Sequence, residues 1–363
     1  MPSSAAPPVL FAAGDDRWPG DGRSRQLSVI ADELARRATP VHWCGAAERE
    51  RGAAELLDRV RPALLVIDAD TASYRTAAAA LARSVPFVLA TARPASTVFS
   101  HLLPRRARPA GRAASPRPRR YAEAAAAVLG FSVFGLEYAF PAPAHLHMVG
   151  PMRAERPEAG RVGREGPATR RWLAEHDSVV YASLGAHPPL TAEHVSALFA
   201  AFARLRPPHH ALWRLTRPQR ELLPPRHAWP DHLRIEDADP EDAADAEVLA
   251  HPHVRAFVTH GAHDRFHEAV YFGKPLLVLP LHADSAEFGA RAVASGVGLA
   301  VAAAPGFGVH DVLPGLLRLL GDRRFDEEAR RWSGRLRQAG GVRRAAGLLL
   351  DELGRSAHAG TRS

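Results

Sequence analysis

Cysteine and lysine are almost absent from this chain of 363 residues. Cys44 is the only cysteine, which excludes an internal disulfide and any multi-cysteine zinc or iron–sulfur site. A single thiol is typical of a reducing, cytoplasmic setting. Lys274 is the only lysine among 47 basic residues, and alanine is abundant, so the basic composition indicates a GC-rich coding genome more than a selected basic surface.

The sequence also lacks a long hydrophobic run. Residues 121–140 are rich in alanine but include Glu123 and Glu137, so we expect no transmembrane helix and no membrane partner. The segment VLFAA, from Val9, has no basic leader and predicts a first strand instead of a signal peptide. With 46% hydrophobic and 24% charged residues, the composition excludes a disordered chain, and the length predicts two domains.

Acidic residues are missing from one strongly basic stretch. Between Pro104 and Tyr121 the sequence reads PRRARPAGRAASPRPRR, and without its arginines the net charge of +8 would be +1. Its proline, glycine and serine residues disfavour a regular helix or strand, so the pattern predicts a solvated loop. A phosphate-binding segment for nucleic acid or an anionic membrane is the alternative. We expect no nucleic-acid partner, because no aromatic residues are interleaved with the arginines.

Short apolar runs alternate with amphipathic stretches along most of the chain, which predicts an α/β fold with parallel sheets. We expect an N-terminal Rossmann-like domain over 1–152, a linker over 153–175, a C-terminal Rossmann-like domain over 176–340, and a helix and tail over 341–363. Two doubly wound sheets of this kind face each other across a cleft, where ligands bind. The predicted strands are VLFAA, PVHWC, ALLVID, PFVLA and HMVGP, then SVVYASLG, HALWRL, HLRIED, VRAFVTHG, KPLLVLPL and GLAV.

The block from 249 to 287 carries the most chemical information. Its strand ends at His260, Gly261 makes a turn, and a helix begins near Asp264. The first-turn amides and the helix dipole form an anion site, to which the His260 imidazole can donate a hydrogen bond. Glu268 lies one turn further along the helix, where a carboxylate can accept both hydroxyls of a ribose. The next strand brings Asp284 to the same edge, so the block predicts a site for a pyrophosphate and a sugar.

These residues resemble the donor-binding signature of the UDP-glycosyltransferase superfamily. The matching features are HP, AFVTHG, the glutamate eight residues after His260, the GKP turn and PLHAD. The segments RPALLVID, LHMVGPM, WLAEHDSVVYASLG and HALWRL are similar to other parts of the family pattern, in the same order. The resemblance implies the GT-B fold of two Rossmann-like domains, in a divergent member of the actinobacterial natural-product type with a shortened N-terminal domain.

The resemblance also implies a function. The family transfers a hexose, with inversion, from a nucleotide diphosphate donor such as a UDP-sugar to a hydroxyl of a small-molecule acceptor. It requires no metal and no cofactor apart from the nucleotide sugar as co-substrate, and a homodimer stays open as the oligomeric state. Fixed hydrogen-bond donors stabilise the charge that develops on the leaving diphosphate. Matched position by position with the family pattern, the resemblance implies that the nucleotide sugar is bound by Ser183, Gly185, His260, Gly261, Asp264, Arg265, Glu268, Asp284 and Ser285.

The sequence departs from the family pattern at several positions. Arg23 stands where the family has its catalytic histidine, and an arginine cannot take a proton from a hydroxyl. Asp15, Asp16 and Asp21 lie in the same loop, but the sequence singles out none of them as the base. Residues 238–241 read ADPE where the family has a tryptophan that stacks on the nucleobase. A catalytically degenerate, glycosyltransferase-like auxiliary or binding protein is therefore the alternative function.

Two histidines of the same block have the spacing of metal ligands. His263 and His267 are four residues apart, and His260 or His282 could supply a third ligand. The chain has 19 histidines, so such pairs arise by chance. We therefore predict no metal site.

Overall fold

The computed structural model of the chain consists of two compact units. The first unit comprises residues 1–155 and 336–363, and the second comprises residues 156–335. None of the described helices has both the length and the apolar content needed to cross a bilayer. The structure describes residues 7–12, 22–44, 52–69, 74–99, 119–137, 139–153, 166–186, 189–238, 245–281, 283–302 and 306–360.

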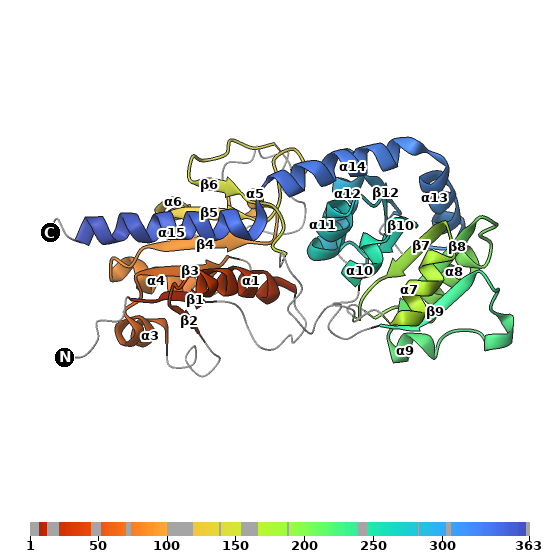
Figure 1. Cartoon of the computed structure of the whole chain (residues 1–363), viewed down its shortest axis with the longest axis horizontal. Helices are drawn as coiled ribbons and strands as arrows, with labels where there is room; N and C mark the ends of the chain where they lie inside the picture. The colour runs from red at the N-terminus through yellow and green to blue at the C-terminus, as the bar shows by residue number, and fades with distance from the viewer. Residues whose placement is uncertain are drawn as a thin grey trace. The chain divides into compact units, whose positions relative to one another are not determined.

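The first unit is built on a six-stranded sheet in which every described strand pair is parallel (Figure 1). Its strand order is β2-β1-β3-β4-β5-β6, and Val9 aligns with Leu64 in the central pair. The inner strands are buried along their whole length, as expected for apolar runs with helices on both faces. The strands are β1 (Val9–Ala12), β2 (Val41–Trp43), β3 (Leu64–Asp68), β4 (Phe87–Thr91), β5 (Ala127–Gly130) and β6 (Leu146–Met148).

Helices from both ends of the chain cover this sheet. Leu27 and Ile30 of α1 pack with Val342 and Leu349 of α15 in one apolar cluster with strand residues. The C-terminal helix therefore completes the core of the N-terminal sheet, and Figure 1 shows it alongside that sheet. The helices of this unit are α1 (Gly22–Arg36), α3 (Ala53–Val60), α4 (Tyr74–Ala82), α5 (Ala95–Val98), α6 (Arg119–Ala124) and α15 (Gly341–Gly360).

The second unit repeats the architecture with a different strand order, β12-β11-β10-β7-β8-β9. Its described strand pairs are also parallel, and one irregularity in register lies between Val254 and Ala256. The strands are β7 (Ser178–Ser183), β8 (His209–Leu215), β9 (Leu233–Asp237), β10 (Val254–Thr259), β11 (Leu276–Val278) and β12 (Gly298–Ala300).

One face of the second sheet packs against α8 and α13. Leu198 and Phe202 of α8 and Leu316 of α13 share a buried cluster with the Trp213 side chain of β8. Phe266, on α11, is buried as well. The helices of this part of the chain are α7 (Pro167–Ala174), α8 (Ala192–Phe202), α9 (Arg217–Arg220), α10 (Asp245–Ala250), α11 (His263–Tyr271), α12 (Ala283–Ala294), α13 (Val309–Gly321) and α14 (Arg323–Gln338), with a 3-10 turn at Arg226–Ala228.

The predicted α/β class with two Rossmann-like, parallel sheets is confirmed. Each strand predicted from an apolar run is present, but the prediction omitted β5. That strand lies in the alanine-rich stretch, where helix-favouring alanines hide a short strand whose burial comes from its neighbours β4 and β6. The helix expected over 341–363 is present as α15, and two further helices, α13 and α14, precede it.

The only lysine of the chain is buried in the second unit. The Nζ atom of Lys274 donates hydrogen bonds to the carbonyl oxygens of His251 and Val254, at 2.9 and 3.0 Å. Burial lowers the pKa of Lys274 to about 8. The side chain therefore ties the turn before β10 to the turn before β11.

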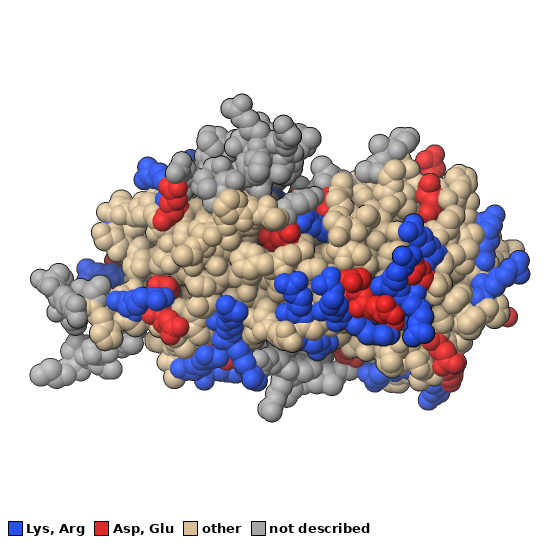
Figure 2. All heavy atoms as spheres, turned by 90° about the horizontal axis from the view of Figure 1, so that it is seen from above, with Lys and Arg blue, Asp and Glu red and all other residues tan. Residues whose placement is uncertain are grey.

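Acidic and basic side chains on α14 pair with each other across one helical turn. Arg331 contacts Glu328 at 2.5 Å, and Arg330 pairs with Asp326. Figure 2 shows acidic and basic side chains side by side on the face seen from above. Residues 104–118 of the basic stretch lie outside the described residues, so the solvated loop stays a prediction there, whereas Arg119 and Arg120 at the end of the stretch begin the helix α6.

Replacing Leu349 with alanine is expected to lower the free energy of unfolding of the first unit by about 2–5 kcal/mol, because a fully buried side chain would leave a cavity. Urea unfolding followed by circular dichroism measures this change. The matched control is Arg344→Ala on the exposed side of the same helix, which is expected to cost less than about 0.5 kcal/mol. Equal losses in the two variants would contradict the role of α15 in this core.

Candidate functional site

The order of strands in the second sheet determines where a ligand can bind. The chain passes from β7 to β8 and β9 on one side of β7, then crosses to β10 on its other side. The carboxyl ends of β7 and β10 therefore meet at the topological switch point, which is where open α/β sheets bind ligands. Ser183 ends β7, and His260 follows β10 directly. A Cβ atom added to Gly185 would lie 3.5 Å from Cε1 of His260, so these predicted residues are brought together.

The turn after β10 requires a glycine. Gly261 has φ of +89°, a conformation that disfavours side chains, and an added Cβ would lie 2.7 Å from Cγ1 of Val278 and 3.0 Å from the carbonyl oxygen of Ser285. Ser285 is fully buried in the first turn of α12. Gly261 thus lets the β10–α11 turn approach the beginning of α12, and it places two further predicted residues side by side.

The first turn of α11 differs from a simple anion site. The backbone N–H of Arg265 donates to Oδ1 of Asp264 at 3.0 Å, so a carboxylate already accepts from one first-turn amide. The Arg265 side chain turns into the protein, where NH1 lies 3.4 Å from Oε2 of Glu268. Glu268 keeps 19% of its side chain exposed, whereas the Arg265 side chain is 7% exposed and pairs with a buried carboxylate.

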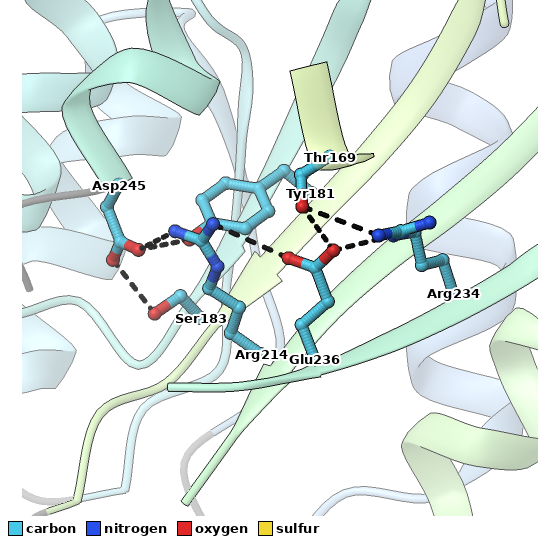
Figure 3. Close-up of polar contacts among 7 residues, drawn as sticks. All are labelled: Thr169, Tyr181, Ser183, Arg214, Arg234, Glu236 and Asp245. Carbon is cyan, nitrogen blue, oxygen red and sulfur yellow. Dashed lines mark hydrogen bonds and ion pairs between the residues drawn. The ribbon is translucent and has the colours of Figure 1, made fainter. Parts of the chain in front are cut away.

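A buried carboxylate that is not among the residues predicted from the sequence lies beneath this site. Asp245, at the beginning of α10, is 2% exposed. Oδ2 of Asp245 accepts from Oγ of Ser183 at 3.0 Å and pairs with NH1 of Arg265 at 2.7 Å. Oδ1 accepts from the Tyr181 hydroxyl and from NH1 of Arg214, the latter at 3.1 Å. Figure 3 shows the Tyr181, Ser183 and Arg214 side chains converging on this carboxylate.

The charges around Asp245 determine its protonation state. Burial alone would raise the pKa of the Asp245 carboxyl, but the Arg265 guanidinium and the other contacts hold it below its ordinary value. Burial and the charge of Asp245 raise the pKa of Tyr181 well above its ordinary value. The phenol therefore stays protonated and donates to an ionised carboxylate.

The polar network continues away from the switch point. NH2 of Arg214 lies 3.5 Å from Oε2 of Glu236, and Oε1 of Glu236 accepts from Arg234 at 2.6 Å and from Thr169 at 2.5 Å (Figure 3). Asp245, Glu236 and Glu268 thus balance three arginines. Asp245 follows a run of other acids and alanines in the sequence, and no local pattern distinguishes it. Only its burial does.

Several predicted residues, or their side chains, lie outside the described part of the chain. Asp284 lies in α12, but its side chain is outside the described residues, as is all of His282. Arg23 lies in α1, again without a described side chain. The loop with the three candidate aspartates, Asp15, Asp16 and Asp21, and the segment 239–244 also lie outside the described part.

The first unit holds a buried carboxylate at its own switch point, between β1 and β3. Asp68 ends β3 and is 3% exposed. A second acid, Glu137, lies in the loop after β5, and its Oε2 accepts from the backbone N–H of Ala95 at 2.7 Å. Neither acid is among the site residues predicted from the sequence. An aspartate that ends an apolar strand, as in LLVID, was the signal available for Asp68.

The pair His263 and His267 is packed within the protein. The centroids of the two imidazole rings are 4.2 Å apart, and the Nδ1 atom of His267 is 2.9 Å from the His263 carbonyl oxygen. The Phe288 ring contacts both imidazoles. Across the described ranges, no group of three or more His, Cys, Asp or Glu residues is arranged to hold a metal ion. The pair therefore has an observed packing role in the core between α11 and α12.

Sequence comparison identifies the family. The sequence model of the family described as "UDP-glucoronosyl and UDP-glucosyl transferase" matches residues 121–337, which is more than half of the chain. The chain therefore belongs to this family. The match includes the β7, β10 and α11 residues described above, and the predicted family membership is confirmed.

Two curated relatives share the matching region. Erythritol-mannosyl-transferase 1 of Pseudozyma antarctica (strain T-34) is 35% identical over 105 residues, which cover 28% of this chain and 17% of that protein. UDP-glucuronosyltransferase 2C1 of Oryctolagus cuniculus is 32% identical over 127 residues, which cover 35% and 23%. The matches thus span less than a quarter of each relative's own length.

Solved structures resemble almost the whole chain. The calicheamicin glycosyltransferase CalG4 has a TM-score of 0.67 at 20% identity and covers 96% of this chain and 98% of its own. Os79 from O. sativa, in complex with U2F and trichothecene, has a TM-score of 0.72 at 17% identity, with coverages of 95% and 100%. These similarities show the fold, and the predicted GT-B class is confirmed.

Acidification is expected to weaken the fold through His267. Burial lowers the pKa of His267 from its ordinary 6.5 to about 4, so below pH 6.5 the unfolded chain binds a proton that the folded chain excludes. The free energy of unfolding is therefore unaffected by the titration of His267 above pH 6.5. It falls by about 3 kcal/mol as the pH falls from 6.5 to 4. Urea unfolding at several pH values measures it. His267→Gln should flatten the profile in this window, whereas the exposed control His310→Gln should not.

Proposed function

We propose that this chain is a glycosyltransferase that moves a hexose from a nucleotide diphosphate donor to a hydroxyl of a small molecule, with inversion. The observation that carries the proposal is the contact of Gly185 with His260 and of Gly261 with Ser285 at the switch point of the second sheet. Glu268 is linked to Ser183 at the same place through Arg265 and Asp245. Family membership supports a UDP-sugar as the donor. The comparisons support transfer over the degenerate alternative, since the matched relatives are named as transferases.

In this proposal the second unit binds the donor. The Glu268 carboxylate accepts the ribose hydroxyls, and His260 donates a hydrogen bond to the pyrophosphate. Amides of the β10–α11 turn add positive dipole ends at the same place. When the bond between the sugar and the diphosphate breaks, these fixed groups stabilise the charge on the leaving oxygen, so the site needs no cofactor besides the donor.

The first unit is proposed to serve the acceptor. The acceptor hydroxyl attacks the anomeric carbon, the bond to the diphosphate breaks, and the hydroxyl proton passes to a base. We assign this base to Asp68, because it is a buried carboxylate at the switch point of the first sheet and Arg23 cannot accept a proton.

The names of two structural neighbours support a proposal for the acceptor class. CalG4 is named for calicheamicin, and the Os79 structure contains a trichothecene. We therefore propose a hydroxylated natural product as the acceptor. A cytoplasmic setting is part of the proposal, because the single cysteine excludes internal disulfides.

The donor assignment is tested with Glu268→Gln. Wild-type protein is expected to bind UDP more tightly than 2′-deoxy-UDP in calorimetry, because Glu268 accepts from both ribose hydroxyls. The variant should lose about 10- to 100-fold in affinity for UDP, the effect of a lost charged hydrogen bond, and should no longer distinguish the two nucleotides. Glu247→Gln, on α10, is the control that keeps wild-type affinity. No heat from wild-type protein with UDP, TDP or their sugars would refute donor binding.

The base assignment is tested with Asp68→Asn. The catalytic rate constant is expected to fall by about 10²- to 10⁴-fold, because an amide cannot accept the proton, while KM for the donor stays unchanged. Product analysis by mass spectrometry over an acceptor panel measures the rate. Glu137→Gln retains an oxygen that can accept from Ala95 and should stay active. A fully active Asp68→Asn variant would refute the assignment, and donor binding without product from wild-type protein would point to the auxiliary binding role.

A further inference from the structure

Asp245 contacts two residues of the proposed donor site from the side of the protein interior. Its Oδ2 atom accepts from Ser183, at the end of β7, and pairs with Arg265, in the first turn of α11. These elements form the two sides of the switch point. One carboxylate therefore links the two segments between which the donor is proposed to bind.

The link extends to the proposed ribose ligand. NH1 of Arg265 lies 2.7 Å from Asp245 and 3.4 Å from Glu268. Asp245 is 2% exposed and the Arg265 side chain 7%, so solvent screens their pairing little. Glu268 is the partly exposed end of this chain of charges. Its carboxylate orientation thus depends on a guanidinium that Asp245 holds in place.

Asp245 also determines the hydrogen-bonding character of Ser183. A serine hydroxyl has one proton, and Ser183 donates it to Asp245 at 3.0 Å. Toward a ligand, the Ser183 oxygen can then act only as an acceptor. This favours a hydroxyl of the donor over a phosphate oxygen as its partner.

Burial of this carboxylate is costly unless it is fully paired. Both oxygens of Asp245 have two partners each, which come from β7, β8 and α11. Packed apolar side chains often stabilise a fold as well as a buried ion pair does, so stability alone is a weak reason for such a network. Its directed hydrogen bonds instead fix the orientation of the groups that they contact.

We propose that Asp245 is a positioning residue of the donor site, which orients the Ser183 hydroxyl directly and the Glu268 carboxylate through Arg265. It acts through these residues and does not itself contact the donor. The inference rests on the proposed function. Donor affinity therefore depends on a residue that is not among the predicted site residues.

The test is Asp245→Asn, measured by calorimetry with UDP and by steady-state kinetics with a UDP-sugar. Kd for UDP and KM for the donor are expected to rise at least about tenfold, because Arg265 and Glu268 lose their fixed orientation. The rate constant at saturating donor should change less than about threefold, since the reacting groups are intact. A merely structural role would reduce the amount of folded enzyme and leave KM unchanged.

Glu236→Gln is the matched control. It weakens contacts to Arg214, Arg234 and Thr169 in the same network, on the side away from the switch point (Figure 3). Its thermal midpoint should fall, but Kd for UDP should stay within about twofold of wild type. Equal Kd values for Asp245→Asn and wild type would overturn the inference. Wild-type protein that binds no UDP would instead overturn the proposed function.

A charge-balanced variant covers the case in which Asp245→Asn does not fold. The single substitution leaves two buried guanidinium groups facing a neutral amide. Adding Arg214→Gln removes one of them and leaves Arg265 unchanged. The double variant should show the same rise in KM relative to Arg214→Gln alone. An unchanged KM in that comparison would overturn the inference.

Discussion

The reversal of strand order between β7 and β10 is the constraint on which the rest of the second unit depends. Two neighbouring parallel strands whose following segments diverge leave an opening at their carboxyl ends. Ser183 and His260 are at this opening because they end or follow those strands. Gly261 then allows the next turn to approach α12, since any side chain there would collide with Val278. Backbone geometry thus assembles the site from segments distant in sequence.

Buried charge is the second organising feature. Asp245 is almost inaccessible and stays ionised because two guanidinium groups and two hydroxyls outweigh its desolvation. Further arginine–carboxylate contacts extend the network across β8 and β9. Similar charges on the surface, such as those of α14, are screened by solvent and contribute little to stability. Because solvent screens this buried cluster little, its charges can orient the side chains of the proposed site.

Prediction from sequence succeeded for features that depend on neighbouring residues, such as strands, turns and helix starts. Apolar runs identified the strands, and the β10–α11 block identified the turn and helix that hold His260 and Glu268. It failed for β5, whose alanines favour a helix and whose strand conformation depends on pairing with β4 and β6. It also omitted Asp245 and Asp68, because burial of a carboxylate depends on residues far away in the chain. Arg265, expected to face the donor, turns inward for the same reason.

The sequence by itself determined the α/β class, the family and the identity of the residues after β10, because strand periodicity and motif spacing are properties of neighbouring residues. Only the tertiary structure decided which of those residues meet. It joined the C-terminal helix to the N-terminal sheet, placed Ser285 beneath Gly261, and gave Asp245 its arginine partners. These contacts arise from the packing of segments far apart in the chain, and no local pattern encodes them.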